Sequence, residues 1–387
     1  MRIVHVITRM IVGGAQENTL LCCRDLQNIY GDEVTLVTGP ALGPEGDLLE
    51  QHPEFDVPVK LLPSLRRAIH PWRDIVAYRA LLRTLSELEP DIVHTHSAKG
   101  GFLGRLAAHR LGIPVVHTVH GAPFHDYQPN AARFFFTQCE RWAARRCDRL
   151  ICVADAMTEL LVRAHVTSPE RCVTIYSGME VEPFLEANRR REATRKSLGF
   201  ASHHVVIGKI ARLFHLKGHA DLVEAAEGVA RACPQVRFLL VGDGVLRRDI
   251  ERQIAKRGLE EHFVLTGLVP PSRIPELIGA MDALVHVSLR EGLARALPQA
   301  LMAEKPVVSY AIDGAPEVVV PEETGLLVEP RDVRQLEQAL IRVATDAEAR
   351  QRWGREGRRR CVERFGHERM TELIRNLYQD VLAERMG

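Results

Sequence analysis

The chain has 387 residues, 46% of them hydrophobic, which is enough to bury two cores of ordinary domain size. Its 51 lysines and arginines balance 50 aspartates and glutamates, and the formal charge of +1 argues against nucleic acid as a partner. Eight cysteines without a C-x-x-C pair disfavour a zinc site or a disulfide framework and suit a cytoplasmic compartment. No run of about 18 apolar residues occurs and no signal peptide is recognisable, so we expect no spanning helix.

Short β-branched runs alternate with longer helical patterns in the first part of the chain. This rhythm is typical of βαβ units on a parallel sheet. The predicted strands are RIVHVIT (2–8), EVTLVT (33–38), DIVHTH (91–96), PVVHTVH (114–120) and RLICVA (149–154).

A second series of the same kind follows, so we expect an α/β protein with two tandem, doubly wound, Rossmann-like domains. The charged segment 178–201 separates the two series and marks the boundary, which gives domains of 1–177 and 178–365. Apolar residues at helical spacing, among them Leu373 and Leu377, predict a closing helix up to Met386. The strands of the second series are HVVIGKIA (204–211), VRFLLVGDG (236–244), HFVLTG (262–267), DALVHVS (282–288) and PVVSY (306–310).

Ligands of such sheets lie beyond the carboxyl ends of the strands, so the residues there are the candidates for a site. Gly13 and Gly14 follow the first strand and let the backbone turn sharply toward an anion, although a plain tight turn explains them equally well. They do not form a G-x-G-x-x-G dinucleotide motif. His120 lies where a strand ends, either as a functional residue or as a histidine satisfied by loop packing.

Two cations flank the start of a helical pattern in the second half of the chain. Arg212 offers a planar fork of donors and Lys217 a point charge, a pair that suits a diphosphate better than two solvated surface cations. Asp243, in V-G-D-G, is interpreted as a turn-stabilising residue.

The stretch SLREGLARALPQALMAEKPVV (288–308) carries Glu291 in a loop and Gln299 eight positions later, in a helix expected to start near Ala296–Pro298. The amides before this helix could bind an anion. They belong to Gly292, Leu293, Ala294 and Arg295.

Together these motifs resemble family 4 of the glycosyltransferases. The shared order is G-G near the N-terminus, T-V-H-G, R-L-x-x-x-K-G, V-G-D-G, E-G with [E/Q]-A-[ML] and P-V-V, then G-x-P-E-V-V and T-G-L-L-V. The resemblance covers nearly the whole chain. It implies the two-domain GT-B architecture with domains that face each other across a cleft, and a C-terminal helix of about 366–387 that returns to the first domain and packs Leu373 and Leu377.

The same resemblance implies a retaining transfer of a sugar from a UDP- or GDP-linked donor, without a metal or another cofactor. Arg212 and Lys217 would hold the diphosphate, Glu291 the donor sugar and Gln299 the ribose, while His120 would lie near the transferred sugar. Val269, in the loop after the strand 262–267, is counted with the donor-binding residues. Gln299 stands where the family usually has Glu, yet an amide can donate to one ribose hydroxyl and accept from the other.

The expected partners are a nucleotide-sugar donor and a carbohydrate or lipid-linked acceptor, with peripheral membrane contact as an option. The basic stretch 62–74, with Trp72, could touch a membrane or lie in solvent. For 133–150 we favour a core-packed helix with an arginine face over a membrane-binding one. Another GT-B enzyme, such as an epimerase or phosphorylase, and an idle nucleotide-sugar binding module are the alternative functions.

Overall fold

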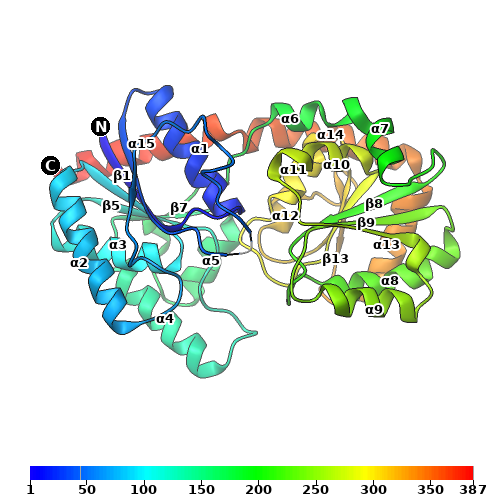
Figure 1. The fold of residues 1–387 in the computed structure, drawn as a ribbon, viewed down its shortest axis with the longest axis horizontal. Coiled ribbons are helices and arrows are strands. Elements are labelled where there is room, and N and C mark those ends of the chain that lie inside the picture. Colours follow the sequence, from blue (N-terminus) through cyan, green and yellow to red (C-terminus); the bar gives the residue numbers. More distant parts are fainter. Residues whose placement is uncertain (44, 387) are drawn as a thin grey trace. The chain divides into compact units, whose positions relative to one another are not determined.

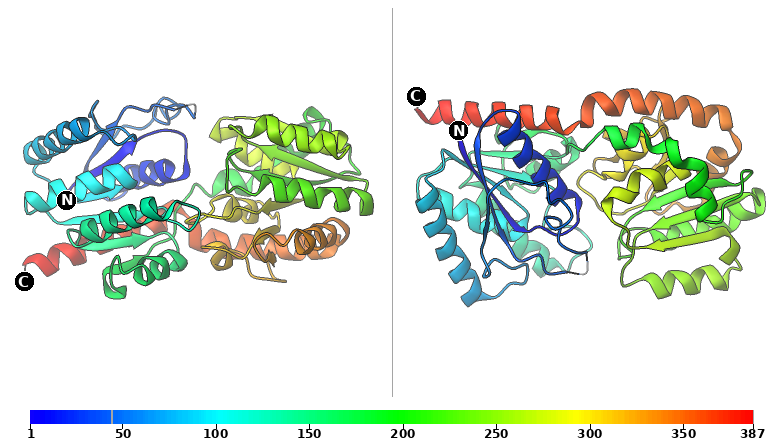
Figure 2. Two further views of the ribbon diagram at one scale, coloured as in Figure 1. Left: turned by 90° about the horizontal axis from the view of Figure 1, so that it is seen from below. Right: turned by 45° about the horizontal axis from the view of Figure 1, so that its top comes forward.

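The computed structural model describes residues 1–43 and 45–386 and divides the chain into two compact units. The first unit contains Met1–Met179 and the chain from Gly366 onward, and the second contains Glu180–Phe365. The sequence places these divisions at 177/178 and near 366. Both units are parallel α/β structures, which confirms the predicted fold class, and helices cover both faces of each sheet (Figures 1 and 2).

Within the described residues, the first unit has a seven-stranded sheet in the order β3-β2-β1-β4-β5-β6-β7. Its strands are β1 (Arg2–Arg9), β2 (Glu33–Gly39), β3 (Val59–Leu61), β4 (Ile92–His96), β5 (Val115–Val119), β6 (Arg149–Cys152) and β7 (Cys172–Thr174). Its helices are α1 (Gly14–Asn28), α2 (Pro71–Leu88), α3 (Ala98–Arg110), α4 (Asn130–Ala144), α5 (Asp155–Arg163) and α15 (His367–Met386).

Within the described residues, the second unit has a six-stranded sheet in the order β10-β9-β8-β11-β12-β13. Its strands are β8 (Val205–Ile210), β9 (Val236–Val241), β10 (Phe263–Gly267), β11 (Ala283–His286), β12 (Val307–Tyr310) and β13 (Gly325–Val328). Its helices are α6 (Glu182–Leu185), α7 (Arg191–Ser197), α8 (His219–Ala232), α9 (Arg247–Lys256), α10 (Ile274–Ala280), α11 (Ala296–Met302), α12 (Ala315–Val318), α13 (Val333–Thr345) and α14 (Ala347–Phe365).

The ten predicted strands are all present, but the short strands β3, β7 and β13 were not predicted as strands. No helix of the described chain is both long and apolar enough to cross a membrane.

The closing helix α15 packs on α1 and the first sheet. Met370, Ile374 and Leu377 are buried in the core that β1, β2 and α1 share. Leu373 is 40% exposed, so the expectation that it packs there was wrong. Polar contacts flank the buried face of α15. His367 pairs with Asp25 of α1 at 2.7 Å, and Asp25 also accepts a hydrogen bond from Thr371.

A close approach of backbones fixes the start of α15. A Cβ at Gly178 would lie 2.5 Å from the Cα of His367, so only glycine lets these segments meet. The amide of His367 then donates to the carbonyl of Met179, and the amide of Gly178 points at the sulfur of Met370. Glycine at position 178 is therefore a packing requirement.

The second unit is pinned by a buried carboxylate at the start of β11. Asp282 pairs with Arg191 at 2.6 Å and with Arg195 at 3.1 Å, and it accepts a hydrogen bond from the amide of Val206 on β8. Burial opposes ionisation, but the two arginines and this amide outweigh it and hold the pKa of Asp282 below its usual value. The charged segment after the domain boundary is thereby attached to the sheet.

We predict that Asp282→Asn lowers the free energy of unfolding by about 3 kcal/mol, because it leaves two arginines short of a partner. Asp249→Asn, which removes an exposed carboxylate from Arg252, is the control. Because the pKa of Asp282 is lower in the folded than in the unfolded state, its contribution to stability is present above about pH 4 and is lost as the pH falls. Urea unfolding should therefore show a difference that shrinks on acidification. Equal effects of the two variants at neutral pH would contradict this account.

Candidate functional site

The strand order of each sheet reverses at one point, and that point is where open α/β sheets bind ligands. In the second unit the neighbours β8 and β11 lead into opposite halves of the sheet, and the loops after them carry Lys217 and Glu291. In the first unit the corresponding neighbours are β1 and β4. Most of the sequence-predicted residues therefore lie where the topology favours a site, while His120 follows β5 and Val269 follows β10.

Backbone contacts join the loop after β8 to the loop after β11. The amide of Leu289 donates to the carbonyl of Leu216 at 2.8 Å. Gly218 has a left-handed φ of 67°, and a Cβ there would come within 1.8 Å of the carbonyl oxygen of Val287. Glycine is required for both reasons. Leu216 also has a positive φ, of 65°, so this loop holds backbone strain of the kind found at ligand sites.

This junction brings two opposite charges that are 74 positions apart into contact. Lys217 Nζ donates to Glu291 Oε1 at 2.6 Å, and both side chains keep about a fifth of their surface exposed (20% and 21%). His286 Nε2 lies 3.2 Å from the same oxygen. The amide of Glu291 donates to Asp313 at 2.6 Å, which attaches this loop to the loop after β12.

The neighbouring groups favour the charged form of the Glu291 carboxyl. Burial works against the charge of Glu291, but Lys217 and His286 outweigh it and hold the pKa of this carboxyl well below its usual value. A fixed carboxylate can accept hydrogen bonds from hydroxyls, and the adjacent ammonium can donate to an anion. The two groups can therefore bind a ligand that carries both hydroxyls and an anionic group.

Buried polar atoms without hydrogen-bond partners in the described part of the chain lie behind this pair. They are Lys209 Nζ, His219 Nδ1, Ser288 Oγ and both ring nitrogens of His286, the latter despite its ion-pair distance to Glu291. Burial, assisted by Lys217, lowers the pKa of Lys209 to about 7. Lys209 and His286 were not predicted as site residues, because in the sequence they occupy ordinary positions of the strands β8 and β11.

Arg212 is exposed in the same loop as Lys217, and its guanidinium carbon lies 5.0 Å from the centre of the Phe214 ring. Its carbonyl accepts a hydrogen bond from His219 Nε2. Asp243 accepts from the amide of Gly244 and pairs with Arg247 at 3.2 Å, so it stabilises a turn, as predicted.

The remaining donor-side candidates surround α11 or follow β10. Gln299 lies part-exposed inside α11, and Pro298 occupies the first turn of this helix, as expected. Val269 follows β10 and is part-exposed. In the sheet β9 separates β10 from β8, and the role of Val269 stays a prediction. So do the roles of the amides between β11 and α11, which belong to Gly292, Leu293, Ala294 and Arg295.

In the first unit Gly13 caps α1, and its carbonyl accepts hydrogen bonds from the amides of Gln16 and Glu17. Its φ of 173° is extended and open to any residue, and Gly14 has no positive φ. The chain bends at Val12 and Gly13 before the helix N-terminus, as predicted, but the backbone angles there do not require glycine. Contact of either glycine with a ligand stays a prediction.

His120 directly follows β5 and is part-buried. Strand alternation puts Val116, Thr118 and His120 on the face that α15 covers, and His117 on the opposite face, as expected. His120 Nε2 lies 3.2 Å from His96 Nδ1 and the two rings stack. His120 thus belongs to a cluster that the sequence analysis did not identify.

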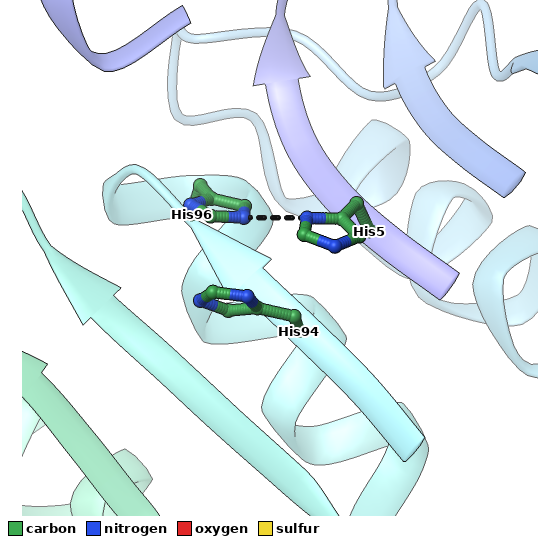
Figure 3. A group of neighbouring side chains, drawn as sticks. All are labelled: His5, His94 and His96. Carbon is green, nitrogen blue, oxygen red and sulfur yellow. Dashed lines mark hydrogen bonds between the residues drawn. The ribbon is translucent and has the colours of Figure 1, made fainter. Parts of the chain in front are cut away.

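Three buried histidines form the centre of that cluster (Figure 3). His5 and His94 are partners in the register of β1 and β4, and His96 lies two positions further along β4. His5 Nδ1 and His96 Nε2 are 3.0 Å apart. One nitrogen from each ring lies within 4.8 Å of the others, a spacing that could hold a metal ion. The signal in the sequence is polar histidine inside two apolar strands, once in H-V-I-T (5–8) and at alternate positions in H-T-H (94–96).

The acceptor-side stretches expose large aromatic residues. Trp72, at the start of α2, is 76% exposed, and Phe134 and Phe135 of α4 are 67% and 53% exposed. Trp142 is also exposed and carries the Arg146 guanidinium over its ring. The expectation that 133–150 is a core-packed helix was wrong for these residues, since the core of this region takes Phe136 as its partner instead.

Two family models match the chain, one in each unit. Residues 12–183 match the model described as "Glycosyltransferase Family 4", and residues 190–360 match "Glycosyl transferases group 1".

Curated relatives extend over most of the chain. The UDP-Gal:alpha-D-GlcNAc-diphosphoundecaprenol alpha-1,3-galactosyltransferase of Escherichia coli is 29% identical over 99% of this chain and 98% of its own length. The 2-deoxystreptamine glucosyltransferase of Streptomyces kanamyceticus is 30% identical over 73% of this chain and 74% of its own.

Solved structures agree on the fold. Anabaena HepE in complex with UDP and glucose superposes with a TM-score of 0.84 at 20% identity, covering 98% of this chain and 99% of its own. Taken together with the two parallel sheets and the motifs at their switch points, these matches show that the chain belongs to family 4 of the glycosyltransferases and is a glycosyltransferase of the GT-B architecture.

Proposed function

We propose that this glycosyltransferase moves a hexose from a UDP-linked donor to a lipid-linked or small-molecule acceptor, with retention of anomeric configuration and without a divalent metal. The observation that carries the proposal is the Lys217–Glu291 ion pair, 2.6 Å long, at the switch point of the second sheet. It offers an anion-binding ammonium and a hydroxyl-binding carboxylate side by side, which are the two groups that a sugar diphosphate requires.

The choice of UDP rests on similarity to named relatives. The Escherichia coli relative is named for UDP-Gal as donor and a diphosphoundecaprenol-linked acceptor, and a relative from Saccharomonospora viridis is named a D-inositol 3-phosphate glycosyltransferase. GDP as the nucleotide is the alternative from the sequence. A donor panel decides between them.

The metal-free mechanism is argued from the fixed cations. The leaving nucleoside diphosphate develops negative charge as the bond between the anomeric carbon and the diphosphate oxygen breaks. Lys217 and Arg212 would stabilise that charge without reorganisation. In this proposal the two side chains take the place of a divalent ion. Glu291 holds the sugar hydroxyls, so that the transferred carbon keeps its alignment with the acceptor.

Gln299 is assigned to the ribose. Its position in α11, eight residues after Glu291, separates it from the sugar-binding carboxylate. The amide oxygen can accept from one hydroxyl and the amide nitrogen can donate to the other. Compared with a carboxylate, this loses one charge-assisted bond, worth about 1 kcal/mol, and it also avoids repulsion of the diphosphate.

The acceptor side is proposed to lie in the first unit. Phe134 and Phe135, exposed on α4 beside arginines, form a surface that suits contact with an anionic membrane holding a lipid-linked acceptor. Co-sedimentation with anionic vesicles tests this contact. Replacing both phenylalanines with serine should abolish it.

The central experiment offers the purified protein UDP-, GDP- and ADP-sugars with an undecaprenyl-diphosphate-linked acceptor and measures the nucleoside diphosphate released. We expect UDP release, an α-linked product from an α-linked donor, and unchanged rates in EDTA. If EDTA abolishes transfer and magnesium or manganese restores it, the metal-free mechanism is wrong. Release of free sugar isomers or sugar phosphates instead would identify another GT-B reaction.

Arg212→Ala and Lys217→Ala should each lower kcat/KM by about 30- to 1,000-fold, which corresponds to the roughly 2–4 kcal/mol of one preorganised charge contact. Lys256→Ala, which removes an exposed cation from the end of α9, is the control and should change little. Steady-state kinetics with the preferred donor make the comparison. Rates of either site variant within about threefold of the wild type would refute the assignment.

Glu291→Gln and Gln299→Ala should affect different kinetic constants. The first should lower kcat by about tenfold or more, because it misplaces the sugar. The second should mainly raise the donor KM, and Gln299→Glu should keep or modestly improve donor affinity. Glu251→Gln, which removes an exposed partner of Arg247, controls for loss of a carboxylate. A Gln299→Ala variant with a kcat as low as that of Glu291→Gln and an unchanged KM would place the amide in the chemistry instead.

A further inference from the structure

A continuous series of hydrogen-bonded side chains runs from the exit of β5 to helix α15. Its first link joins His120 Nε2 to His96 Nδ1 at 3.2 Å, and its second joins His96 Nε2 to His5 Nδ1 at 3.0 Å. The rest of the series consists of His5 Nε2 to Tyr378 Oη at 3.5 Å, Tyr378 Oη to His94 Nδ1 at 2.5 Å, and His94 Nε2 to Thr118 Oγ1 at 2.7 Å.

Strand alternation produces this series. β1 sends Ile3, His5 and Ile7 to the face that α15 covers, β4 does the same with His94 and His96, and β5 with Thr118. Tyr378 reaches this face from α15 and is fully buried. Figure 3 shows the hydrogen bond that joins the rings of His5 and His96, with the ring of His94 beside them.

The interior rings are neutral. Burial lowers the pKa of His5 to about 3 and those of His94 and His96 well below their usual value, and it raises the pKa of Tyr378. The neighbouring titratable groups include His117 and His120, which reinforce the effect on His94 and His96. A neutral imidazole has one N–H and one lone pair, so each ring must donate on one side and accept on the other.

This condition leaves two settings in which every hydrogen bond of the series is made. One reversed ring would set two donors or two lone pairs against each other between histidines, or at Tyr378 leave the phenol proton without a histidine acceptor. In one setting all four histidines carry their proton on Nε2, and in the other all carry it on Nδ1. The phenol of Tyr378 has a single proton, and its nearer partner is His94 Nδ1 rather than His5 Nε2. Donation to His94 requires the Nε2–H setting throughout.

We propose that Tyr378, acting through His5 and His96, fixes His120 in its Nε2–H tautomer, so that His120 Nδ1 carries a lone pair that accepts a hydroxyl of the transferred sugar. Tyr378, His5 and His96 are positioning residues in this scheme, and helix α15 thereby contributes to the site. The part that concerns the sugar rests on the proposed function. The part that concerns the tautomers does not.

The same three central histidines have the spacing of a metal site. However, all six of their ring nitrogens already have a hydrogen-bond partner, and the rings are fully buried. A metal ion would have to break several of these bonds at once. The geometry therefore favours a hydrogen-bonded series over a metal centre.

The test reads tautomers directly by long-range ¹⁵N–¹H correlation on ¹⁵N-histidine-labelled protein, with signals assigned from single His→Gln variants. We expect His5, His94, His96 and His120 all in the Nε2–H form. Tyr378→Phe takes the acceptor from His5 and should shift His5, His96 and His120 toward Nδ1–H. Thr118→Val removes the acceptor of His94 at the opposite end and should cause the same shift, so the test does not depend on one variant folding.

Thr371→Val is the matched control. It removes a buried hydroxyl from the same helix, but that hydroxyl donates to Asp25 and is not part of the histidine series. It should leave the tautomers unchanged. Wild-type His120 in the Nδ1–H form would overturn the proposal. So would tautomers that stay the same in Tyr378→Phe and Thr118→Val, or zinc that copurifies at one equivalent and is lost with His96→Gln.

Kinetics on the same variants separate this inference from the proposed function. Tyr378→Phe should lower kcat by roughly tenfold with the donor KM within about twofold, since one contact in the transition state is misoriented. Thr371→Val should keep both constants. A shifted tautomer with unchanged kcat would overturn the positioning role. A wild type that releases no nucleoside diphosphate from any donor would refute the proposed function, whereas the tautomer measurement still decides the hydrogen-bonded series.

Discussion

The ion pair between Lys217 and Glu291 depends on the meeting of two loops, and the donor side of the protein depends on that pair. A glycine with a left-handed φ and a backbone hydrogen bond fasten the loop after β8 to the loop after β11. Without this junction the two charges would belong to separate solvated loops, where an ion pair is worth little. At the junction both side chains are largely buried and in contact at 2.6 Å, and the Glu291 carboxyl is held in its charged form, which is the condition for preorganised binding of a charged ligand.

The switch point of the other sheet is built on the opposite principle. There the side chains are neutral and connected by hydrogen bonds, and burial keeps them so. A charged group in that position would have to be desolvated without a counter-ion. Neutral histidines avoid this cost while still passing orientation from Tyr378 to His120. The switch point of the first sheet is thus built from directional hydrogen bonds between neutral groups, and that of the second sheet from an ion pair.

Much of the fold could be predicted from the sequence because central parallel strands contain continuous apolar runs, such as FLLV (238–241) on β9. The strands β3, β7 and β13 were missed because they are short strands at the edges of the sheets, and β3 and β7 have no buried residue that would mark them as core strands. Leu373 was misplaced because helical periodicity marks a face but not its width. Lys217 and Glu291 could be named from motifs, but their contact could not, because it requires β8 and β11 to be neighbours. The contact of His5 with His94 could not be predicted either, because it requires β1 and β4 to be neighbours in the sheet.

The most direct test of this account measures how Lys217 and Glu291 divide the donor between them. Calorimetric titration of UDP, which has a diphosphate but no sugar, should show affinity lowered by about tenfold or more in Lys217→Met and kept within about threefold in Glu291→Gln. The same Glu291→Gln protein should still have lost most of its turnover with the UDP-sugar. Equal losses of UDP affinity in both variants, or no loss in either, would contradict the claim that the ammonium binds the diphosphate and the carboxylate binds the sugar.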